Sequence, residues 1–195
     1  MAIKSVCVYC GSNSGSRPAY TQSARELGQI LAQRRIRLVY GGGRVGLMGT
    51  IADAVLAAGG EVTGVIPESL VAREVAHRSL KDLRIVPSMH QRKALMAELS
   101  DAFIALPGGF GTLEEFAEIL TWAQLGLHRK PHGIINIDGF YDSLLAFFDH
   151  AVAEKFVRPS HRDLVISDPD PARLLDLLAT ARPPSLDKWI DKDQT

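Results

Sequence analysis

The sequence has little that would direct the protein to a nucleic acid or a membrane. Its 22 basic residues balance 22 acidic ones among 195 residues, so no net field would attract DNA, RNA or an anionic membrane. No apolar run reaches the roughly 18 to 20 residues that span a bilayer. The N-terminus also lacks the basic-then-apolar pattern of a secretory signal. We therefore expect a cytoplasmic protein that binds neither nucleic acid nor membrane.

Cysteine is scarce, which argues against a zinc or redox centre. Cys7 and Cys10 have C-x-x-C spacing, but a zinc site needs about four ligands and there is no second pair. Cys7 lies within the apolar run 6–9, whereas a thioredoxin-type motif would open a helix. We interpret both thiols as small buried apolar groups.

Histidine gives no better metal signal. His128 and His132 have the i, i+4 spacing of helical ligands, but Pro131 between them argues against a helix there. We predict no metal site.

Composition and periodicity predict a single α/β domain. Apolar residues make up 46% and charged residues 23% of the chain, as is usual for globular proteins. Short apolar runs predict strands, and they alternate with segments of helical periodicity. The predicted strands cover residues 5–9, 37–40, 62–66, 83–86, 102–106, 133–137 and 164–167. The predicted helices cover residues 19–33, 47–58, 89–99, 112–125, 141–155 and 171–180.

Near-continuous apolar strands are typical of a parallel sheet that is covered on both faces. The pattern therefore predicts a Rossmann-like, doubly wound parallel sheet with helices on both faces. We assign residues 1–182 to this nucleotide-binding domain and residues 183–195 to a polar C-terminal tail.

Glycines follow the predicted strands, where ligands bind in such folds. Gly11 follows the first strand, residues 41–43 follow the second, and residues 107–112 (Pro-Gly-Gly-Phe-Gly-Thr) follow the strand at 102–106. Residues 41–46 match G-x-G-x-x-G, but the dinucleotide fingerprint belongs to the first strand–helix turn. Glu61 also precedes its strand instead of following it, which disfavours NAD or NADP. No Gly-Lys-Ser/Thr follows any glycine turn, so the Walker P-loop is absent.

The turn at 107–112 predicts a phosphate cradle. Its glycines let the backbone approach a ligand, and the helix behind it presents free N–H groups and a partial positive charge. The alternative is a plain capping box, with Thr112 as N-cap and Glu115 as the third residue of the helix. The three preceding glycines favour the cradle, because a capping box does not require them.

Two further constellations could meet an anion. Residues 89–93 (Met-His-Gln-Arg-Lys) place two cations near the start of a helix, which costs little if an anion lies nearby; the alternative is a solvated face. Arg73 and Glu74 follow the third strand, and there a plain surface pair is the simpler interpretation.

These residues resemble the LOG (Lonely Guy) family of cytokinin riboside 5'-monophosphate phosphoribohydrolases. Residues 107–115 fit its P-G-G-x-G-T-x-x-E signature. The resemblance extends, in order, over Cys10-Gly11-Ser12, Tyr40-Gly41-Gly42-Gly43, Gly46-Leu47-Met48-Gly49, Arg73-Glu74, Met89-His90-Gln91-Arg92-Lys93 and Thr121-Trp122-Ala123-Gln124-Leu125-Gly126. Ala72 stands where proline is expected in plant members.

The resemblance implies hydrolysis of the N-glycosidic bond of adenosine 5'-monophosphates, often N6-substituted, to a free base and ribose 5-phosphate. It implies a homodimer with sites near the interface and no cofactor. It identifies Arg92 and Glu115 as the catalytic pair. The implied substrate-binding residues are Glu74, Lys93, Gly109, Phe110, Gly111, Thr112, Leu113, Glu114, Thr121, Gly11, Ser12, Gly43 and Met89.

The implied chemistry suits these residue types. Breaking the bond builds positive charge on the ribose, and a carboxylate such as Glu115 can stabilise that charge and orient water. We place Glu115 in the first turn of its helix, where the helix terminus would keep it ionised. Arg92 has too high a pKa for a general acid, so we expect it to position the phosphate or ribose and to hold Glu115.

Other functions remain open at this point. Relatives of this kind often carry the label lysine decarboxylase, but no Schiff-base lysine with a pyridinium partner is evident. A non-catalytic nucleotide-binding or carrier protein on the same fold is the main alternative, and an NAD-dependent oxidoreductase is a third. The identity of the base is left open, because an apolar extension contributes only about 1 to 3 kcal/mol of discrimination.

Overall fold

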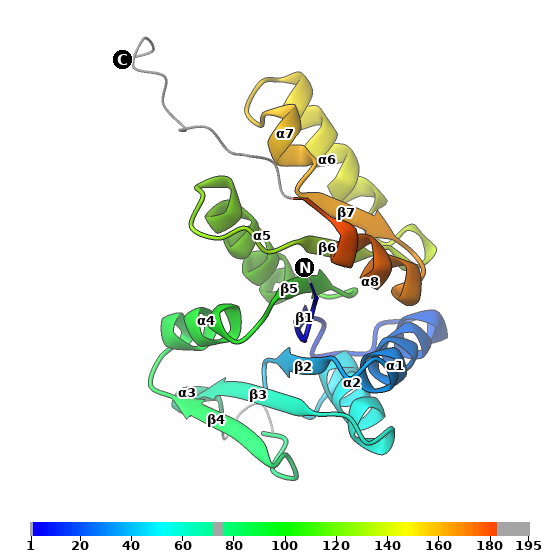
Figure 1. Ribbon diagram of the computed structural model, residues 1–195, viewed down its shortest axis with the longest axis vertical. Coiled ribbons are helices and arrows are strands. Elements are labelled where there is room, and N and C mark those ends of the chain that lie inside the picture. The colour runs from blue at the N-terminus through cyan, green and yellow to red at the C-terminus, as the bar shows by residue number, and fades with distance from the viewer. Residues whose placement is uncertain (1, 72–75, 183–195) are drawn as a thin grey trace.

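The computed structural model describes residues 2–71 and 76–182, which are built around one seven-stranded sheet (Figure 1). Neighbouring strands all run parallel, in the order β4-β3-β2-β1-β5-β6-β7. The strands are β1 (Ser5–Tyr9), β2 (Arg37–Tyr40), β3 (Val62–Pro67), β4 (Asp82–Val86), β5 (Ala102–Ala105), β6 (His132–Ile135) and β7 (Val165–Asp168). The predicted doubly wound α/β architecture is confirmed.

Helices cover both faces of the sheet. They are α1 (Pro18–Gln33), α2 (Gly46–Ala57), α3 (Glu68–Val71), α4 (Met89–Glu98), α5 (Phe110–Gln124), the 3-10 helix η1 (Ile137–Gly139), α6 (Asp142–Ala153), α7 (Pro159–Arg162) and α8 (Pro171–Thr180). Helices α1, α2 and α8 pack on one face, whereas α4, α5 and α6 pack on the other. Within the described ranges, no helix combines the length and the apolar character needed to cross a bilayer.

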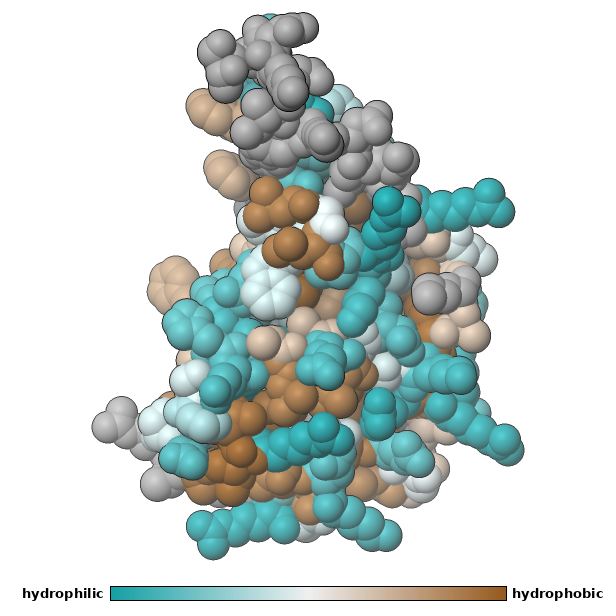
Figure 2. Space-filling model, turned by 60° about the vertical axis from the view of Figure 1, so that its left-hand side comes forward, coloured by the Kyte–Doolittle hydropathy of each residue, from teal (hydrophilic) through white to brown (hydrophobic). Residues whose placement is uncertain are grey.

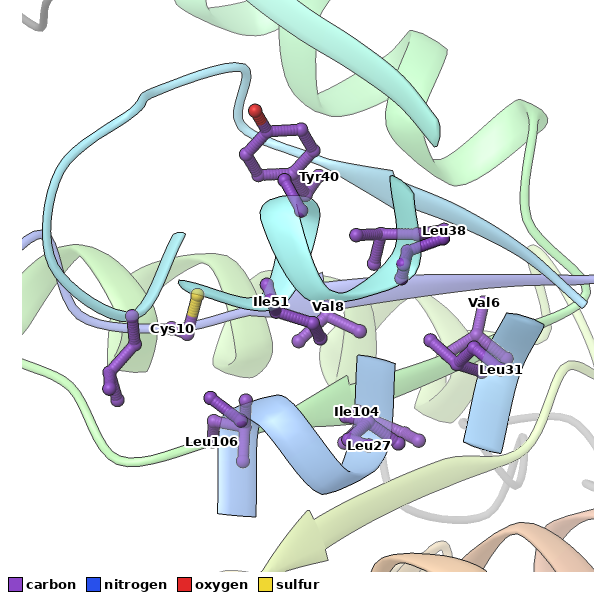
Figure 3. Packing of buried hydrophobic residues seen from close by; sticks show 14 of the residues in the cluster. Val6, Val8, Cys10, Leu27, Leu31, Leu38, Tyr40, Ile51, Ile104 and Leu106 are labelled. Carbon is purple, nitrogen blue, oxygen red and sulfur yellow. The ribbon is translucent and has the colours of Figure 1, made fainter. Parts of the chain in front are cut away.

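The central strands contribute to two cores because alternate side chains point to opposite faces. Val6 and Val8 of β1 face α1 and α2, while Cys7 and Tyr9 face α4 and α5. Figure 3 shows the first core, in which Leu27 and Leu31 of α1 and Ile51 of α2 pack against the sheet. This double burial explains why the central strands are nearly continuous apolar runs instead of alternating.

Local signals set the helix ends that the sequence predicts well. Ser88 caps α4 by accepting a hydrogen bond from the Gln91 N–H at 3.2 Å, and Asp170 caps α8 by accepting from Arg173 at 2.9 Å. Pro18 and Pro171 occupy first-turn positions of α1 and α8, where a missing N–H costs nothing.

The predicted strands and main helices start and end within two residues of those observed. The sequence reading missed the short elements α3, η1 and α7, which are too short for any periodicity to develop. Both cysteines are buried and free, as predicted. The predicted tail at 183–195 lies outside the described residues, as do Arg73 and Glu74.

Candidate active site

The strand order places a switch point between β1 and β5. Strands β2, β3 and β4 follow one another on one side of β1, whereas β5, β6 and β7 follow one another on its other side. Loops at the carboxyl ends of the two central strands therefore diverge and leave a crevice. The Gly11 N–H donates to the Pro107 carbonyl at 3.0 Å, which joins the two loops at its base. A Cβ at Gly11 would meet the carbonyl oxygen of Asn13 at 2.9 Å, so this close approach requires glycine.

A cleft of about 210 Å³ opens at this switch point. Three predicted binding residues line it: Gly11, Ser12 and Gly109. Pro107 and Gly108, from the turn predicted as a phosphate cradle, line it as well. Sequence reasoning missed its other walls, which are Asn13, Ser14, Gly15, Tyr20, Leu47 and Phe140. A larger, shallower hollow of about 570 Å³ between α1 and α2 contains none of the predicted site residues. The cleft at the switch point is therefore the better candidate for a phosphate site.

Helix α5 begins two residues earlier than predicted, so the capping-box reading is wrong. Gly109 is the N-cap, with no side-chain capping bond, and Thr112 lies inside the first turn. The Thr112 side chain is buried against Gly108, where a Cβ would overlap its hydroxyl oxygen. Gly108 thus frees the space into which Thr112 folds. The backbone at Gly109 and Gly111 stays open, because a Cβ at either position would meet no atom within 4 Å.

This earlier start also moves Glu115 into the second turn of α5 instead of the first. We predicted that the helix terminus would keep the Glu115 carboxylate ionised. This prediction is wrong, because the influence of the terminus fades within the first turn. Instead Oε1 of Glu115 lies 3.2 Å from Nη1 of Arg92, and the two side chains are 13% and 7% exposed. A buried guanidinium now provides the neighbouring positive charge.

Arg92 of α4 is fixed by one carbonyl group within β3 and one directly after β2. Its Nε donates to the Val65 carbonyl of β3 at 3.1 Å, and its Nη2 donates to the Gly41 carbonyl after β2 at 3.3 Å. Met89, one turn earlier on α4, places its sulfur 3.3 Å from Nη1. A Cβ at Gly41 would overlap Nη2, so glycine is required beside the guanidinium. Spacing alone could not reveal this role of Gly41.

Electrostatics links this ion pair to the switch point. Burial raises the pKa of the Cys10 thiol, the Glu115 carboxylate raises it further, and Arg92 lowers it. Cys10 immediately precedes Gly11 at the end of β1. The hydrogen bond from Arg92 to the Gly41 carbonyl, which follows the neighbouring strand β2, places the ion pair at the same edge of the sheet. The raised pKa keeps the thiol protonated and a poor nucleophile.

Lys93 takes part in a second cluster of charges. Its Nζ lies 2.6 Å from Glu114 and 3.0 Å from Glu118, both on α5. Burial disfavours the charged ammonium, but the two carboxylates outweigh this and raise the pKa of Lys93. Glu118 was not predicted, although its i, i+4 relation to Glu114 places it on the same helix face.

The remaining predicted residues are spread around these two groups. Phe110 is 93% exposed at the start of α5, and Leu113 packs against the core beneath that helix. Thr121 lies six residues beyond Glu115, about 9 Å along the helix axis, and its hydroxyl donates to the Ala117 carbonyl. Gly43 forms an isolated bridge with Ala76. Glu74 falls outside the described residues.

The described residues contain no group of three or more His, Cys, Asp or Glu side chains that could hold a metal ion. His132 lies in β6, so the prediction that the segment around Pro131 is not helical is confirmed. Its two ring nitrogens are buried without a hydrogen-bond partner. The site as a whole combines the Glu115 carboxylate, the Arg92 guanidinium and, at the start of α5, backbone N–H groups that have no intrahelical partner.

Comparisons with known proteins agree with this arrangement. A family model described as "Possible lysine decarboxylase" matches residues 48–178. The probable cytokinin riboside 5'-monophosphate phosphoribohydrolase LOGL9 of Oryza sativa subsp. japonica is 56% identical over 173 residues, which cover 89% of this chain and 76% of that protein. The cytokinin riboside 5'-monophosphate phosphoribohydrolase LOG7 of Arabidopsis thaliana is 52% identical over 180 residues, or 92% of this chain and 83% of that one.

Solved structures support the fold. The molybdenum cofactor binding protein from the phototrophic bacterium Rippkaea orientalis has a TM-score of 0.68 at 23% identity, covering 91% of this chain and 96% of that one. The molybdenum cofactor carrier protein from Chlamydomonas reinhardtii has a TM-score of 0.68 at 21% identity, covering 89% and 94%. At these identities the likeness concerns the fold alone. The matched family model and the two plant relatives show that the chain belongs to the LOG family.

Proposed function

We propose that the protein hydrolyses the N-glycosidic bond of adenosine 5'-monophosphates, including N6-substituted ones, to a free base and ribose 5-phosphate. The observation that carries this proposal is the ion pair of Arg92 and Glu115, held next to the glycine turn that opens α5. The names of the plant relatives support the same reaction.

The glycine turn supplies the proposed phosphate site. Backbone N–H groups at the start of α5, from Gly109 to Gly111, have no intrahelical partner, and a Cβ at Gly109 or Gly111 would meet no atom within 4 Å. Together with the helix dipole they favour a doubly charged phosphate. The Ser12 hydroxyl lines the same cleft and can donate one more hydrogen bond. Binding through the phosphate would explain a requirement for monophosphates over nucleosides.

Glu115 is the proposed catalytic carboxylate. As the bond from C1' to the base nitrogen breaks, its electron pair leaves with the base and positive charge develops on the ribose. The carboxylate stabilises that charge and orients a water molecule, whose oxygen bonds to C1'. Of the two water protons, one remains on the new hydroxyl and the other balances the departing base.

Arg92 acts in this proposal as a holder of Glu115 and of the ribose or phosphate. A guanidinium does not release its proton near neutral pH, so it is no general acid. Its hydrogen bonds to the Val65 and Gly41 carbonyls fix the planar guanidinium, which in turn fixes the Glu115 carboxylate. Accurate placement of this kind supplies a large part of enzymatic rate enhancement.

The lysine decarboxylase description of the family model receives no support from Lys93. A lysine that forms a Schiff base needs a lowered pKa, whereas two carboxylates raise the pKa of Lys93. We propose instead that Lys93 keeps Glu114 in place beside the substrate.

We further propose a homodimer in the cytoplasm. The side of the molecule that carries α4 and α5 shows apolar surface between polar side chains (Figure 2). Phe110 at the start of α5 is 93% exposed, and Leu125 and Leu127 at its end are 52% and 69% exposed. A second copy covering this side would remove these groups from water. Light scattering after size exclusion tests it, since a mass near 21 kDa would contradict a dimer and one near 42 kDa would support it.

The decisive assay is release of ribose 5-phosphate from AMP and from N6-isopentenyl-AMP, with the two free nucleosides as controls. Cleavage of the monophosphates alone supports both the reaction and the phosphate site. A higher rate with N6-isopentenyl-AMP than with AMP would indicate cytokinin release, and the opposite ratio would indicate general AMP breakdown. Binding of AMP without any product would contradict the proposal and favour a nucleotide carrier on the same fold.

A further inference from the structure

We infer that His77 is a positioning residue for Arg92, acting through the glycine turn at 41–43. This inference rests on the proposed function, because it concerns how the Arg92–Glu115 pair is kept in place. His77 is not conspicuous in the sequence, and its ring nitrogens contact Asp53 and Ser79 instead of the catalytic pair. Its side chain is nevertheless 1% exposed and lies among polar partners instead of apolar ones.

The first step of the argument is the clamp on the glycine turn. The His77 N–H donates to the Gly42 carbonyl at 2.9 Å, and the neighbouring Ala76 forms an antiparallel bridge with Gly43. Gly42 has a φ of +75°, a conformation that only glycine adopts freely. A turn of glycines is intrinsically loose, so these backbone bonds are needed to hold it in one shape.

The second step is the anchoring of His77 itself. Its Nε2 lies 2.9 Å from Oδ1 of Asp53 on α2, and its Nδ1 lies 3.0 Å from the Ser79 hydroxyl. An ionised carboxylate can only accept, so Nε2 carries the proton. In the neutral ring, Nδ1 then accepts from Ser79. Both ring nitrogens are satisfied, which fixes the ring in one orientation and ties the 76–77 backbone to α2.

The third step connects the turn to the ion pair. Gly41, at the start of the turn, accepts a hydrogen bond from Nη2 of Arg92, and its missing side chain leaves the guanidinium its space. A shift of the turn would therefore move or release Nη2 and, with it, the contact to Glu115. A displacement of about 1 Å in a catalytic group can cost roughly 100-fold in rate.

The test uses Asp53→Ala, which removes the acceptor for His77 from a surface position, since the Asp53 side chain is 61% exposed. We expect kcat for AMP to fall about tenfold, with little change in the midpoint of thermal unfolding. Asp53→Asn keeps an oxygen acceptor and should restore most of the rate. Asp176→Ala is the matched control, because it removes an exposed carboxylate from a pair with Arg34 on another part of the molecule; its kcat should equal that of the wild type.

A second readout does not depend on turnover. Nε of Arg92 donates to a buried carbonyl, so its N–H resonance should be resolved in a spectrum of 15N-labelled protein. We expect His77→Leu and Asp53→Ala to shift or broaden it, while Asp176→Ala leaves it in place. In an Arg92→Lys background, Asp53→Ala should cost no further activity, since the effect passes through the guanidinium.

The outcomes separate this inference from the proposed function. If the wild type cleaves AMP and both Asp53→Ala and His77→Leu match its kcat, the inference is overturned while the function stands. If the wild type cleaves no monophosphate, the function fails, and the Arg92 resonance alone decides the positioning role. A resonance unmoved in His77→Leu would then overturn it.

Discussion

The Nη1 atom of Arg92 lies 3.2 Å from Oε1 of Glu115, and both side chains are almost fully removed from solvent. A buried carboxylate is costly unless a positive charge and hydrogen bonds compensate it. Arg92 on helix α4 provides the positive charge. The carbonyl groups of Val65 in β3 and Gly41 after β2 fix the position of its guanidinium. The two groups predicted as the catalytic pair are thus one structural unit, contributed by two helices that cover the same face of the sheet.

The first prediction concerns Glu115→Gln. Glutamine keeps an oxygen that can accept from Arg92, so we expect the fold to survive. The negative charge that would stabilise the ribose is lost, and kcat for AMP should drop by roughly 100- to 10,000-fold. Ribose 5-phosphate release and the thermal unfolding midpoint should be measured together.

Glu118→Gln is the control for this experiment. Glu118 lies one turn further along α5 and pairs with Lys93, whereas Glu115 pairs with Arg92. Its kcat should stay within a few-fold of the wild type. Full activity in Glu115→Gln would remove the carboxylate from the mechanism.

Arg92→Lys tests the guanidinium separately from its charge. Lysine keeps a positive charge but cannot reach Val65, Gly41 and Glu115 at once with a single nitrogen. Losing two buried hydrogen bonds should reduce the free energy of unfolding by about 2 kcal/mol, and kcat should fall by at least about 100-fold. Arg173→Lys, in a close pair with Asp168 at the far edge of the sheet, is expected to leave kcat unchanged. Equal rates for both lysine variants would mean that charge alone suffices.

Much of this arrangement follows from local sequence, and the exceptions have identifiable causes. Strands and helices are predictable because burial on both faces makes the central strands nearly continuous apolar runs, and because Ser88 and Asp170 cap their helices through side chains. The start of α5 was misplaced because Thr112 looks like a cap in the sequence. In the fold its side chain packs instead into space that Gly108 leaves open.

The contacts of Arg92 were beyond prediction for a different reason. They join α4 to a carbonyl group within β3 and to one directly after β2, and the strand order that brings these groups together is not encoded in any local pattern. For the same reason the roles of Gly41 and His77 emerge only from the assembled sheet. A glycine signature identifies the turn, whereas tertiary packing decides which carbonyl meets which side chain.

Gly41→Ala is expected to be far more damaging to activity than to folding. A Cβ at this position would overlap Nη2 of Arg92, a flexible side-chain end that can move away. Such a movement breaks the hold on Glu115, so kcat should fall by roughly 100-fold. Gly28→Ala is the matched control, since its Cβ would meet the Ile51 carbonyl oxygen and the Ala54 side chain at 2.8 Å between α1 and α2. That variant should lose stability and keep the kcat of its folded fraction; the reverse pattern would contradict the role of Gly41.

The last prediction concerns acid stability and His132. This side chain is fully buried in β6 and stacks on Phe103, with ring centroids 5.4 Å apart. Burial, aided by the neighbouring His128, lowers its pKa from 6.5 to about 3. Below pH 6.5 the unfolded chain therefore binds a proton that the folded chain refuses. The contribution of His132 to the free energy of unfolding is fully present above pH 6.5. It is lost as the pH falls towards 3, by at most about 1.4 kcal/mol per pH unit.

His132→Phe removes this titration and keeps an aromatic ring against Phe103. Urea unfolding at pH 7.5 and pH 5.0 should show that the wild type loses about 2 kcal/mol more than the variant over this interval. His90→Gln, at an exposed position on α4, is expected to lose as much as the wild type. The comparison uses the difference between two pH values, so any repacking cost of the larger ring cancels. An equal loss in wild type and His132→Phe would mean that other groups, and not His132, set the acid limit of the fold.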